Sequence, residues 1–353
     1  MDDNLIRILK EAGKTAEVVR LDNSSEVLLL PHGGRVLGLF ATGDADNFYW
    51  TNPVLKDAAK ARVLFESDEW QNTGGDRTWL APEIDFFFPK YPDLTVYHQP
   101  RQFDAHAYQL EKIGGAPELR TEFEIKHAKQ ETPIRLRLTK SIETVANPLR
   151  HEAVWKNLSD VVFAGYGLRT TLEFASVPAP TVPVGLWHLI QMPHRGEMFV
   201  PTYGPSRPKI VFGEIPKGDL SELPAGGARY RMTAKNEQKI SLRAASCTGR
   251  AAYLYETAAT WRLVLRNFFV NPSGEYVDAP WTEPGDLGYG VQACNVNGKW
   301  GIFSELEYHI PAIGVPGAPP RSEDFAQVWA YRGTREQIAR IAQELLGVDI
   351  DRS

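Results

Sequence analysis

The chain has 353 residues, of which 43% are hydrophobic and 24% are charged, and its formal net charge is −5. This composition predicts a folded, soluble protein, and the absence of a dense Lys/Arg run argues against nucleic acid as a partner. No stretch offers the roughly 20 consecutive apolar residues that cross a bilayer, so we expect no membrane partner. Residues 1–4 are acidic and do not resemble a signal peptide. We therefore expect a cytoplasmic location, or a periplasmic or secreted one if a signal peptide was removed.

The chain begins with a helical pattern and continues with strands. Leu5, Ile8 and Leu9 recur at helical spacing and Gly13 ends the run, which predicts a helix within residues 1–15. Short apolar or β-branched runs separated by turn residues follow, as is typical of β-strands. The predicted strands are residues 16–20, 26–30, 35–40, 135–144, 152–157, 167–174, 185–192, 241–245, 251–256, 262–270 and 300–309.

The end of the chain predicts a second helix. In residues 334–347, Thr334 is placed to cap the helix and Gly347 to stop it. Strands and helices do not alternate after residue 15, which argues against a parallel α/β sheet. We therefore predict a single domain, 1–353, in which residues 16–331 form one large, all-β antiparallel sandwich between short N- and C-terminal helices.

Several common catalytic and cofactor motifs are missing from the sequence. It contains no GxxxxGKS phosphate loop, no GxGxxG, no GxSxG elbow and no HExxH. Cys247 and Cys294 lack the CxxC spacing of zinc or redox sites, and we expect both to be buried and reduced. The histidine spacings match no metal signature. We predict neither a cofactor nor a bound metal.

Segment 71–83 is dense in groups that bind polar ligands. Two glycines permit close backbone approach, and Asp76 and Arg77 follow them directly. In a strand, Arg77 and Trp79 share one face, where a guanidinium beside an indole suits the hydroxyls and the C–H face of a sugar. The alternative interpretation is a tight turn followed by a structural ion pair between Arg77 and Glu83.

Two further segments carry ionisable side chains. In segment 300–309, period two places Glu305, Glu307 and His309 on one face. Two carboxylates at i and i+2 raise one pKa, which suits a general base, although the same face is also compatible with plain solvent exposure or a cation site. In segment 184–193, His188 lies on an otherwise apolar face. Such a histidine is typical of a core, and beside a cleft it becomes a candidate acid.

Taken together, these segments resemble the galactose mutarotase-like superfamily, which includes the aldose 1-epimerases. Four features, in the order of the family, carry the resemblance across residues 16–310. They are the strand-turn-strand at 28–36, the Gly-Gly-x-Arg element at 74–77 with Trp79 and Glu83, the strand and Asn-Ser/Asp turn at 154–160, and the glutamate strand at 305–307. The resemblance implies a two-layer antiparallel supersandwich with its site on the concave face.

The resemblance also implies roles for individual residues. Arg77 would bind sugar hydroxyls, and Glu305 or Glu307 would take the proton from the anomeric hydroxyl. The family has a histidine after its mid-domain turn, but residues 165–170 contain none, so the acid would be His188, His98 or His106. We expect the catalytic residues to be Glu305, Glu307 and His188, and the sugar contacts to be Arg77, Asp76, Trp79, Glu83, His98 and His309.

The sequence leaves three functions open. The first is an enzyme acting at the anomeric centre of a sugar, such as an aldose 1-epimerase. The second is a non-catalytic carbohydrate-binding protein on the same scaffold. The third is a polysaccharide lyase or glycoside hydrolase that recruits Asp76 and Glu83 as its paired acid and nucleophile. All three predict a small sugar or an oligosaccharide as the partner, and the oligomeric state is not indicated.

Overall fold

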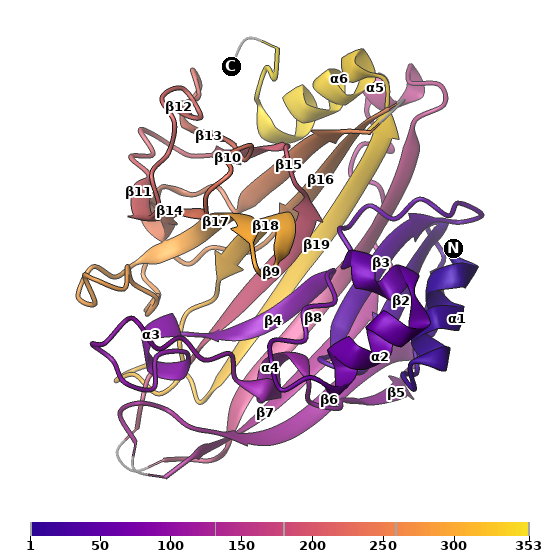
Figure 1. The fold of residues 1–353 in the computed structure, drawn as a ribbon. Coiled ribbons are helices and arrows are strands. Elements are labelled where there is room, and N and C mark those ends of the chain that lie inside the picture. Colours follow the sequence, from indigo (N-terminus) through magenta and orange to yellow (C-terminus); the bar gives the residue numbers. More distant parts are fainter. Residues whose placement is uncertain (1, 131, 179–180, 258–259, 352–353) are drawn as a thin grey trace.

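The computed structural model describes residues 2–130, 132–178, 181–257 and 260–351, and its main feature is a pair of antiparallel sheets packed face to face (Figure 1). Every strand pair among these residues is antiparallel. The first sheet has nine strands, which in spatial order are β1 (Glu17–Leu21), β2 (Ser25–Leu30), β3 (Arg35–Ala41), β4 (Asp76–Ala81), β9 (Gly185–Pro193), β18 (Gly301–His309), β17 (Tyr289–Gly298), β14 (Gln238–Arg243) and β11 (Lys209–Phe212).

The second sheet has ten strands and contains the longest strands of the molecule. In spatial order they are β12 (Leu220–Glu222), β13 (Gly227–Arg231), β10 (Glu197–Pro201), β15 (Arg250–Glu256), β16 (Trp261–Asn267), β19 (Arg321–Gly333), β8 (Val162–Ser176), β7 (Ile134–Glu143), β6 (Ala116–Ile125) and β5 (Gln109–Ile113).

The alternation of side chains explains why the two sheets pack together. In β7, Ile134, Leu136 and Leu138 are buried, whereas Arg135 and Arg137 between them are exposed. Because successive side chains of a strand point to opposite faces, β7 buries one face and leaves the other in solvent. Each such buried side chain contributes about 1.5–3 kcal/mol to the stability of the sandwich.

The main core lies between the two sheets. Ile190 and Leu306 of the nine-stranded sheet belong to the same buried cluster as Leu168 and Val328 of the ten-stranded sheet. The predicted fold class, a large all-β antiparallel sandwich, is therefore confirmed.

Short helices lie at the ends of the chain and in the connections. They are α1 (Asp3–Glu11), α2 (Ala58–Glu66), α3 (Glu83–Phe86), α4 (Arg101–Asp104), α5 (Ala153–Lys156) and α6 (Arg335–Leu346), with two 3-10 helices at η1 (Pro53–Lys56) and η2 (Ala244–Ser246).

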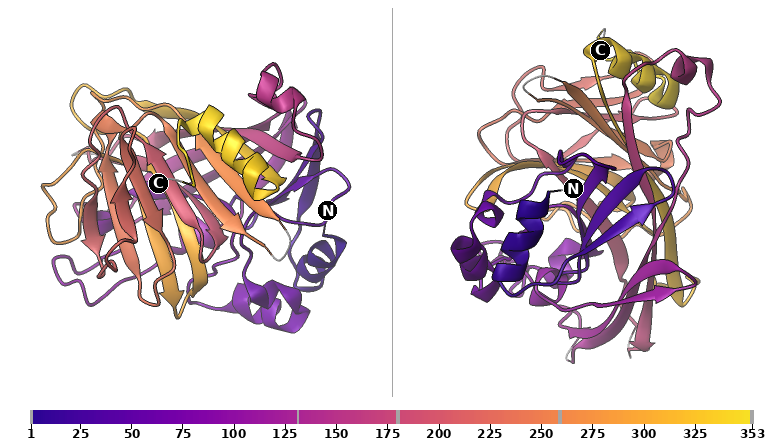
Figure 2. Two further views of the ribbon diagram at one scale, coloured as in Figure 1. Left: turned by 90° about the horizontal axis from the view of Figure 1, so that it is seen from above. Right: turned by 90° about the vertical axis from the view of Figure 1, so that its right-hand side faces the viewer.

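Both predicted terminal helices are confirmed, and they cover different sheets (Figure 2). α1 packs with α2 on apolar side chains of β2 and β3, including Leu28 and Leu37. α6 packs on β16 and β19. The hydroxyl of Thr334 accepts from the amide of Gln337 while the Gln337 side chain accepts from the amide of Thr334, and Gly347 ends the helix at φ 68°. This reciprocal cap and left-handed stop are what the sequence predicted.

One predicted strand is wrong, and several helices were missed. Residues 152–157 contain α5 rather than a strand, and no described strand pairs with them, so local preference decides their conformation. Helix α2 begins after Asp57, whose carboxylate accepts from the amides of Ala59 and Lys60 at 2.9 and 3.0 Å. That cap is a readable helix signal, but the weak amphipathic pattern behind it hides the helix in the sequence.

Two smaller expectations can be compared with the structure. Cys247 and Cys294 are free and buried, as predicted. Among the described residues, every helix is too short or too polar to cross a bilayer.

Candidate functional site

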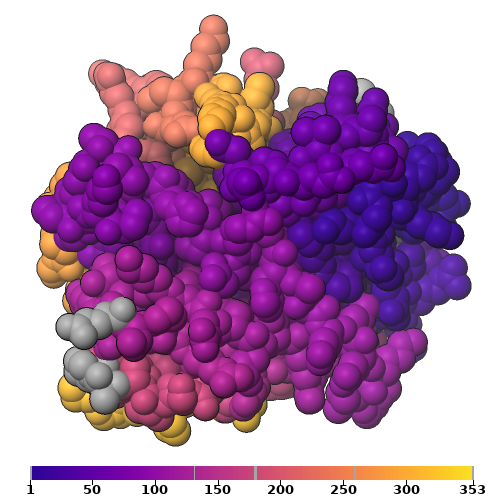
Figure 3. Space-filling view, turned by 60° about the horizontal axis from the view of Figure 1, so that its bottom comes forward, coloured from indigo at the N-terminus to yellow at the C-terminus, as the bar shows by residue number. Residues whose placement is uncertain are grey.

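A cavity of about 570 Å³ opens on the face of the nine-stranded sheet that points away from the ten-stranded sheet. Five neighbouring strands form its floor, and loops around residues 68–70, 82–99 and 281 form its walls. Seen from below, purple segments from the first hundred residues lie next to an orange segment of the last quarter of the chain (Figure 3). The strands contribute, in spatial order, Arg77 and Trp79 (β4), Trp187 (β9), Glu305 and Glu307 (β18), Cys294 and Val296 (β17) and Lys239 (β14).

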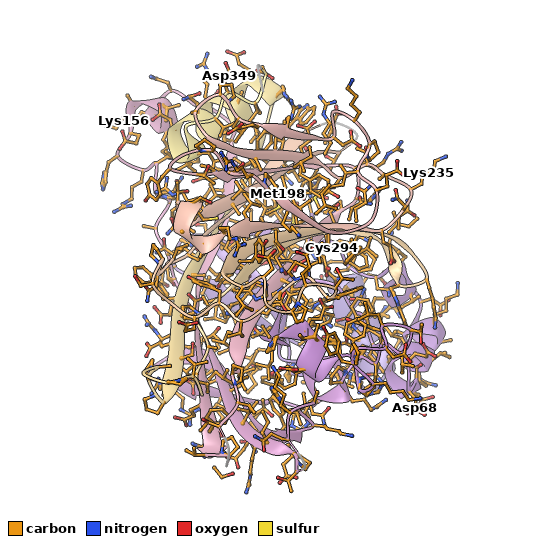
Figure 4. The ribbon with its side chains drawn as sticks, turned by 90° about the vertical axis from the view of Figure 1, so that its left-hand side faces the viewer. Asp68, Lys156, Met198, Lys235, Cys294 and Asp349 are labelled. Atoms are coloured by element: carbon orange, nitrogen blue, oxygen red, sulfur yellow. The ribbon has the colours of Figure 1, made fainter. Side chains whose placement is uncertain are left out.

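The cavity reaches from the interior to the edge of the molecule. Cys294, on the floor, is 7% exposed, whereas the side chain of Asp68, at the rim, is fully exposed; both are labelled in Figure 4. The deep part is thus shielded by protein, and the outer part faces solvent.

A tight turn at Gly74 and Gly75 delivers Arg77 to the cavity floor. Both glycines have positive φ, at 93° and 79°. A Cβ on Gly75 would lie 2.4 Å from the carbonyl oxygen of Val36, so the close approach of β3 and β4 leaves no room for a side chain. The sequence signal of paired glycines therefore reflects a real backbone requirement.

Replacing Gly75 with Ala is expected to destabilise the fold by about 3 kcal/mol or more, since left-handed strain of about 1–2 kcal/mol is added to an overpacking cost of about 1–3 kcal/mol. Gly115→Ala is the matched control, because Gly115 has φ 88° but no atom within 4 Å of the added Cβ. Denaturant unfolding of both variants measures the difference. Equal losses of stability would show that the steric contact at Gly75 is unimportant.

Arg77 is the centre of the first polar cluster. Its Nη2 donates to Glu305 Oε1 at 2.5 Å, and both side chains are almost fully buried. The guanidinium contacts two neighbouring indole rings, 4.0 Å from the centroid of Trp79 and 5.0 Å from that of Trp70, and the two centroids are 5.7 Å apart. The Gln191 amide adds a donor to the same Glu305 oxygen at 3.2 Å. Charge-assisted bonds and cation–π contacts together hold Arg77 in one orientation.

Asp104 fixes the two tryptophans that contact Arg77. Its Oδ2 accepts from the indole nitrogens of Trp70 and Trp79 at 2.7 and 3.1 Å, and its Oδ1 pairs with the buried Arg35. Because Asp104 is itself buried and paired, this arrangement orients the two rings from behind the cavity.

Lys239 is the centre of the second polar cluster. Its Nζ lies 3.5 Å from Glu307 Oε2 and 3.4 Å from Glu83 Oε2, and 4.3 Å from the ring centroid of Trp187. Each of these carboxylates also accepts from an indole: Trp187 Nε1 donates to Glu307 at 2.8 Å, and Trp281 Nε1 donates to Glu83 at 2.8 Å. One buried cation therefore holds two buried carboxylates in place.

The carboxyl groups of Glu305 and Glu307 are close but differ in their surroundings. Burial raises the pKa of Glu305, and the Arg77 charge opposes that rise. Burial raises the pKa of Glu307 to about 8, with Lys239 opposing and the charge of Glu305 adding to the rise. Burial and the charges of Glu305 and Glu307 also raise the pKa of Cys294. Because Glu305 lies 2.5 Å from its own cation while Glu307 shares Lys239 at 3.5 Å, Glu305 is the carboxyl group that ionises more readily, and Glu307 the one that holds its proton more readily.

Burial and neighbouring charges also shift the pKa values of Glu83 and Lys239. Burial raises the pKa of Glu83 against the opposing charge of Lys239. Burial acts to lower the pKa of Lys239, but Glu307 and Glu83 outweigh it and the pKa is raised. Lys239 therefore stays charged at neutral pH.

The structure brings most of the predicted site residues together. The cavity is lined by Arg77, Trp79, Glu83, His98, Glu305 and Glu307.

Asp76 and His188 lie elsewhere, in the core between the sheets. Asp76 pairs with Arg266 of the ten-stranded sheet, and His188 Nδ1 lies 3.0 Å from the hydroxyl of Thr78. Each alternates along its strand with a residue of the cavity floor, so each points to the opposite face. The structure does not place His188 within reach of a ligand in the cavity, and we do not assign it a catalytic role.

His309 and His106 are also outside the cavity lining. His309 shares the face of Glu307 but is buried behind Trp187, with ring centroids 5.4 Å apart and nearly parallel planes. His106 packs near Phe123, and His98 is the one candidate acid of the histidine set that lines the cavity.

Several residues in or next to the cavity were not predicted from the sequence. Lys239 lies just before the predicted strand 241–245, whereas the observed β14 begins at Gln238. Asp104 ends a four-residue helix that has no periodic pattern. The face of β9 that carries Trp187 and Gln191 was visible from period two, but its position beside Glu305 depends on pairing with β18.

One group of side chains in the described part of the chain has the spacing of a cation site. Ligand atoms of Cys294, Glu305 and Glu307 lie within 4.8 Å of one another, rather than the set of Glu305, Glu307 and His309 considered from the sequence. Arg77 and Lys239 already neutralise these carboxylates. A cation there would meet two fixed positive charges, so the donor set does not fit a metal well.

A family model matches residues 3–353, and its description is "Family of unknown function (DUF6786)". The chain belongs to this family. No curated protein matches the sequence.

Solved structures similar to this one have low sequence identity. The Slr1438 protein from Synechocystis sp. PCC 6803 has 11% identity and a TM-score of 0.48, covering 91% of this chain and 96% of its own. A galactose mutarotase-like protein from Lactobacillus casei ATCC 334 has 10% identity and a TM-score of 0.46, covering 90% and 99%. The galactose 1-epimerase from Lactobacillus acidophilus NCFM has 9% identity and a TM-score of 0.42, covering 91% and 95%.

Proposed function

We propose that this protein binds an aldose in the cavity and interconverts its anomers by acid–base catalysis. The observation that carries the proposal is the Arg77–Glu305 pair beside a second, more weakly paired carboxyl group, Glu307. When two neighbouring titratable groups have different surroundings, their pKa values move apart, and such a pair commonly provides the acid and the base of an active site.

The cavity has the properties of a sugar site. Its volume of about 570 Å³ falls within the roughly 300–1,000 Å³ of small-molecule sites. Trp70, Trp281 and Trp300 are half-buried at its walls and offer ring surface for the C–H face of a sugar. The carboxylates between them accept hydrogen bonds from hydroxyl groups. Apolar faces alternating with acceptors suit a polyhydroxylated ring.

The two glutamates match the demands of anomer exchange. Glu305 takes the proton of the anomeric hydroxyl, whose oxygen forms a carbonyl with C1 as the bond from C1 to the ring oxygen breaks. Glu307 gives its proton to that ring oxygen. After rotation about the C1–C2 bond, the ring closes on the other face of the carbonyl. The ring-oxygen proton then returns to Glu307 and Glu305 gives its proton back to the anomeric oxygen, so the site is regenerated.

The spacing of the glutamates supports this assignment. The two oxygens that exchange protons are bonded to the same carbon, so acid and base must lie close together on one side of the sugar. Oxygens of Glu305 and Glu307 lie within 4.8 Å of each other. Glu307 Oε1 has no hydrogen-bond partner among the described residues, so a proton on it is not held by another protein group.

The hydrolase or lyase reading has less support. It needs Asp76 and Glu83 as a pair, but Asp76 is buried between the sheets while Glu83 lines the cavity. We do not propose that function.

The test is anomer exchange measured by NMR on a panel of free aldoses. The wild-type protein is expected to exchange the anomers of at least one aldose faster than the spontaneous rate, and that sugar should bind in calorimetry. Binding without any acceleration would instead support a non-catalytic carbohydrate-binding protein. The absence of both binding and exchange across the panel would refute the proposal.

A further inference from the structure

Every cation that lines the cavity, among the described residues, is already paired with a carboxylate. Arg77 donates to Glu305, and Lys239 lies between Glu307 and Glu83. Lys299, at the rim, pairs with Glu69 at 2.8 Å. A phosphate or carboxylate group on a ligand would need a free cation here, and it would have to break one of these pairs to obtain one.

Acidic groups outnumber basic ones around the cavity. Three of them, Glu83, Glu305 and Glu307, are buried in the deep part of the cavity, and three others line its outer part: Asp68, Glu69 and Glu237. The lining itself contains only the three cations named above, and Arg101, outside the lining, pairs with Asp68 at 3.2 Å. Even with Glu307 protonated, the lining carries net negative charge. A cavity of one sign repels ligands of that sign and attracts those of the other.

The cavity also offers a ligand more hydrogen-bond acceptors than donors. The indole nitrogens of Trp70, Trp79, Trp187 and Trp281 all donate to carboxylates of the protein. The N–H groups of these four indoles are therefore already used within the protein and are not free donors for a ligand. What the inner cavity offers in excess is acceptors, which suit hydroxyl or ammonium groups and not the oxygens of an anion.

Glu237 adds a further acidic acceptor at the rim of the cavity. It is exposed, it lines the cavity, and no hydrogen bond or ion pair to it is found in the described part of the chain. Burial and the charge of Glu305 raise the pKa of Glu237, so it shares the electrostatic environment of the inner carboxylates.

We propose that the ligand of this cavity carries no anionic group: the site takes uncharged aldoses, tolerates amino sugars, and rejects sugar phosphates and uronates. This inference rests on the proposed function, because it names the substrate class of the same site. It follows from the pairing of all three cations and the excess of acceptors.

The test compares sugars that differ only in charge. Calorimetry would measure binding of D-glucose, D-glucosamine, D-glucose 6-phosphate and D-glucuronate, together with the four matching galactose compounds, at low salt. The anionic member of each series is expected to bind at least about tenfold more weakly than the neutral one, since like-charge contacts in a site disfavour the wrong ligand strongly. The difference should shrink at high salt through screening of the rim.

Two variants sharpen the result. Glu237→Gln is expected to narrow the ratio between neutral and anionic sugars, whereas Glu344→Gln, the same change on the exposed side of α6, should leave it unaltered. A phosphate or uronate that binds as tightly as its neutral counterpart overturns this inference and leaves the proposed function intact. If neither the eight compounds nor any aldose of the exchange panel binds, the proposed function fails, and this inference fails with it.

Discussion

Replacing either Glu305 or Glu307 with Gln is expected to slow anomer exchange by about 100-fold or more, because a positioned general acid or base typically contributes about 10²–10⁴-fold. The amide keeps the shape of each side chain but can neither take nor give the proton. NMR exchange rates at saturating sugar measure the effect, and Glu344→Gln is the control for a change of one charge. Wild-type rates in both glutamate variants would remove the acid–base assignment.

The pH dependence distinguishes the two roles. Glu307 must be protonated to act as the acid, so the rate should fall as the pH rises through about 8. Glu305 must be ionised to act as the base. The rate should therefore also fall as the pH decreases toward the raised pKa of Glu305, because Glu305 then becomes protonated. In Glu307→Gln, the residual rate should lose the alkaline limb. A profile that is flat across both limbs would contradict these assignments.

Protonation of Glu307 also links stability to pH. Its pKa in the folded protein is raised to about 8 from an ordinary value of 4.5, so folding favours the protonated form. The stabilisation is fully present below the unfolded pKa and is lost as the pH rises through the folded one. Gln mimics the protonated acid, so the unfolding free energy of Glu307→Gln should fall less than that of wild type between pH values of about 6 and 9.

The sequence could predict which residues share one face of a strand. It could not predict whether that face lines the cavity or packs in the core between the sheets. Period two places Arg77 with Trp79 and Glu305 with Glu307, and all four line the cavity. The same rule turns Asp76 away from Arg77. That consequence was available from the sequence, yet the choice between cavity and core depends on which sheet covers each face.

Long-range pairing hides the remaining site residues. Lys239 reaches Glu307 only because β17 joins β14 to β18. His188 shares a face with apolar neighbours, which favours the core, and in the fold its ring stacks on Tyr308 with centroids 4.9 Å apart. Strand order in a large antiparallel sheet is not encoded in local motifs, so neither position followed from spacing.

The Asp76→Asn variant is expected to lose about 3–5 kcal/mol of stability, because it leaves the charge of Arg266 buried without its partner. Asp76 and Arg266 are both 0% exposed and pair across the two sheets. The hydroxyl of Tyr166 also donates to Asp76 at 2.6 Å, and Tyr49 lies 2.9 Å beyond it. Denaturant unfolding measures the loss.

A double variant separates the ion pair from simple damage to the core. In Asp76→Asn, the charge of Arg266 is buried without a partner. Arg266→Met removes that charge, so the double variant should be more stable than Asp76→Asn alone. Costs that simply add would contradict the proposed coupling. Because Asp76 points away from the cavity, sugar affinity of the folded Asp76→Asn protein should stay near that of wild type, whereas a direct sugar contact by Asp76 would weaken it. The same variant therefore tests both the cross-sheet pair and the assignment of this face of β4 to the core.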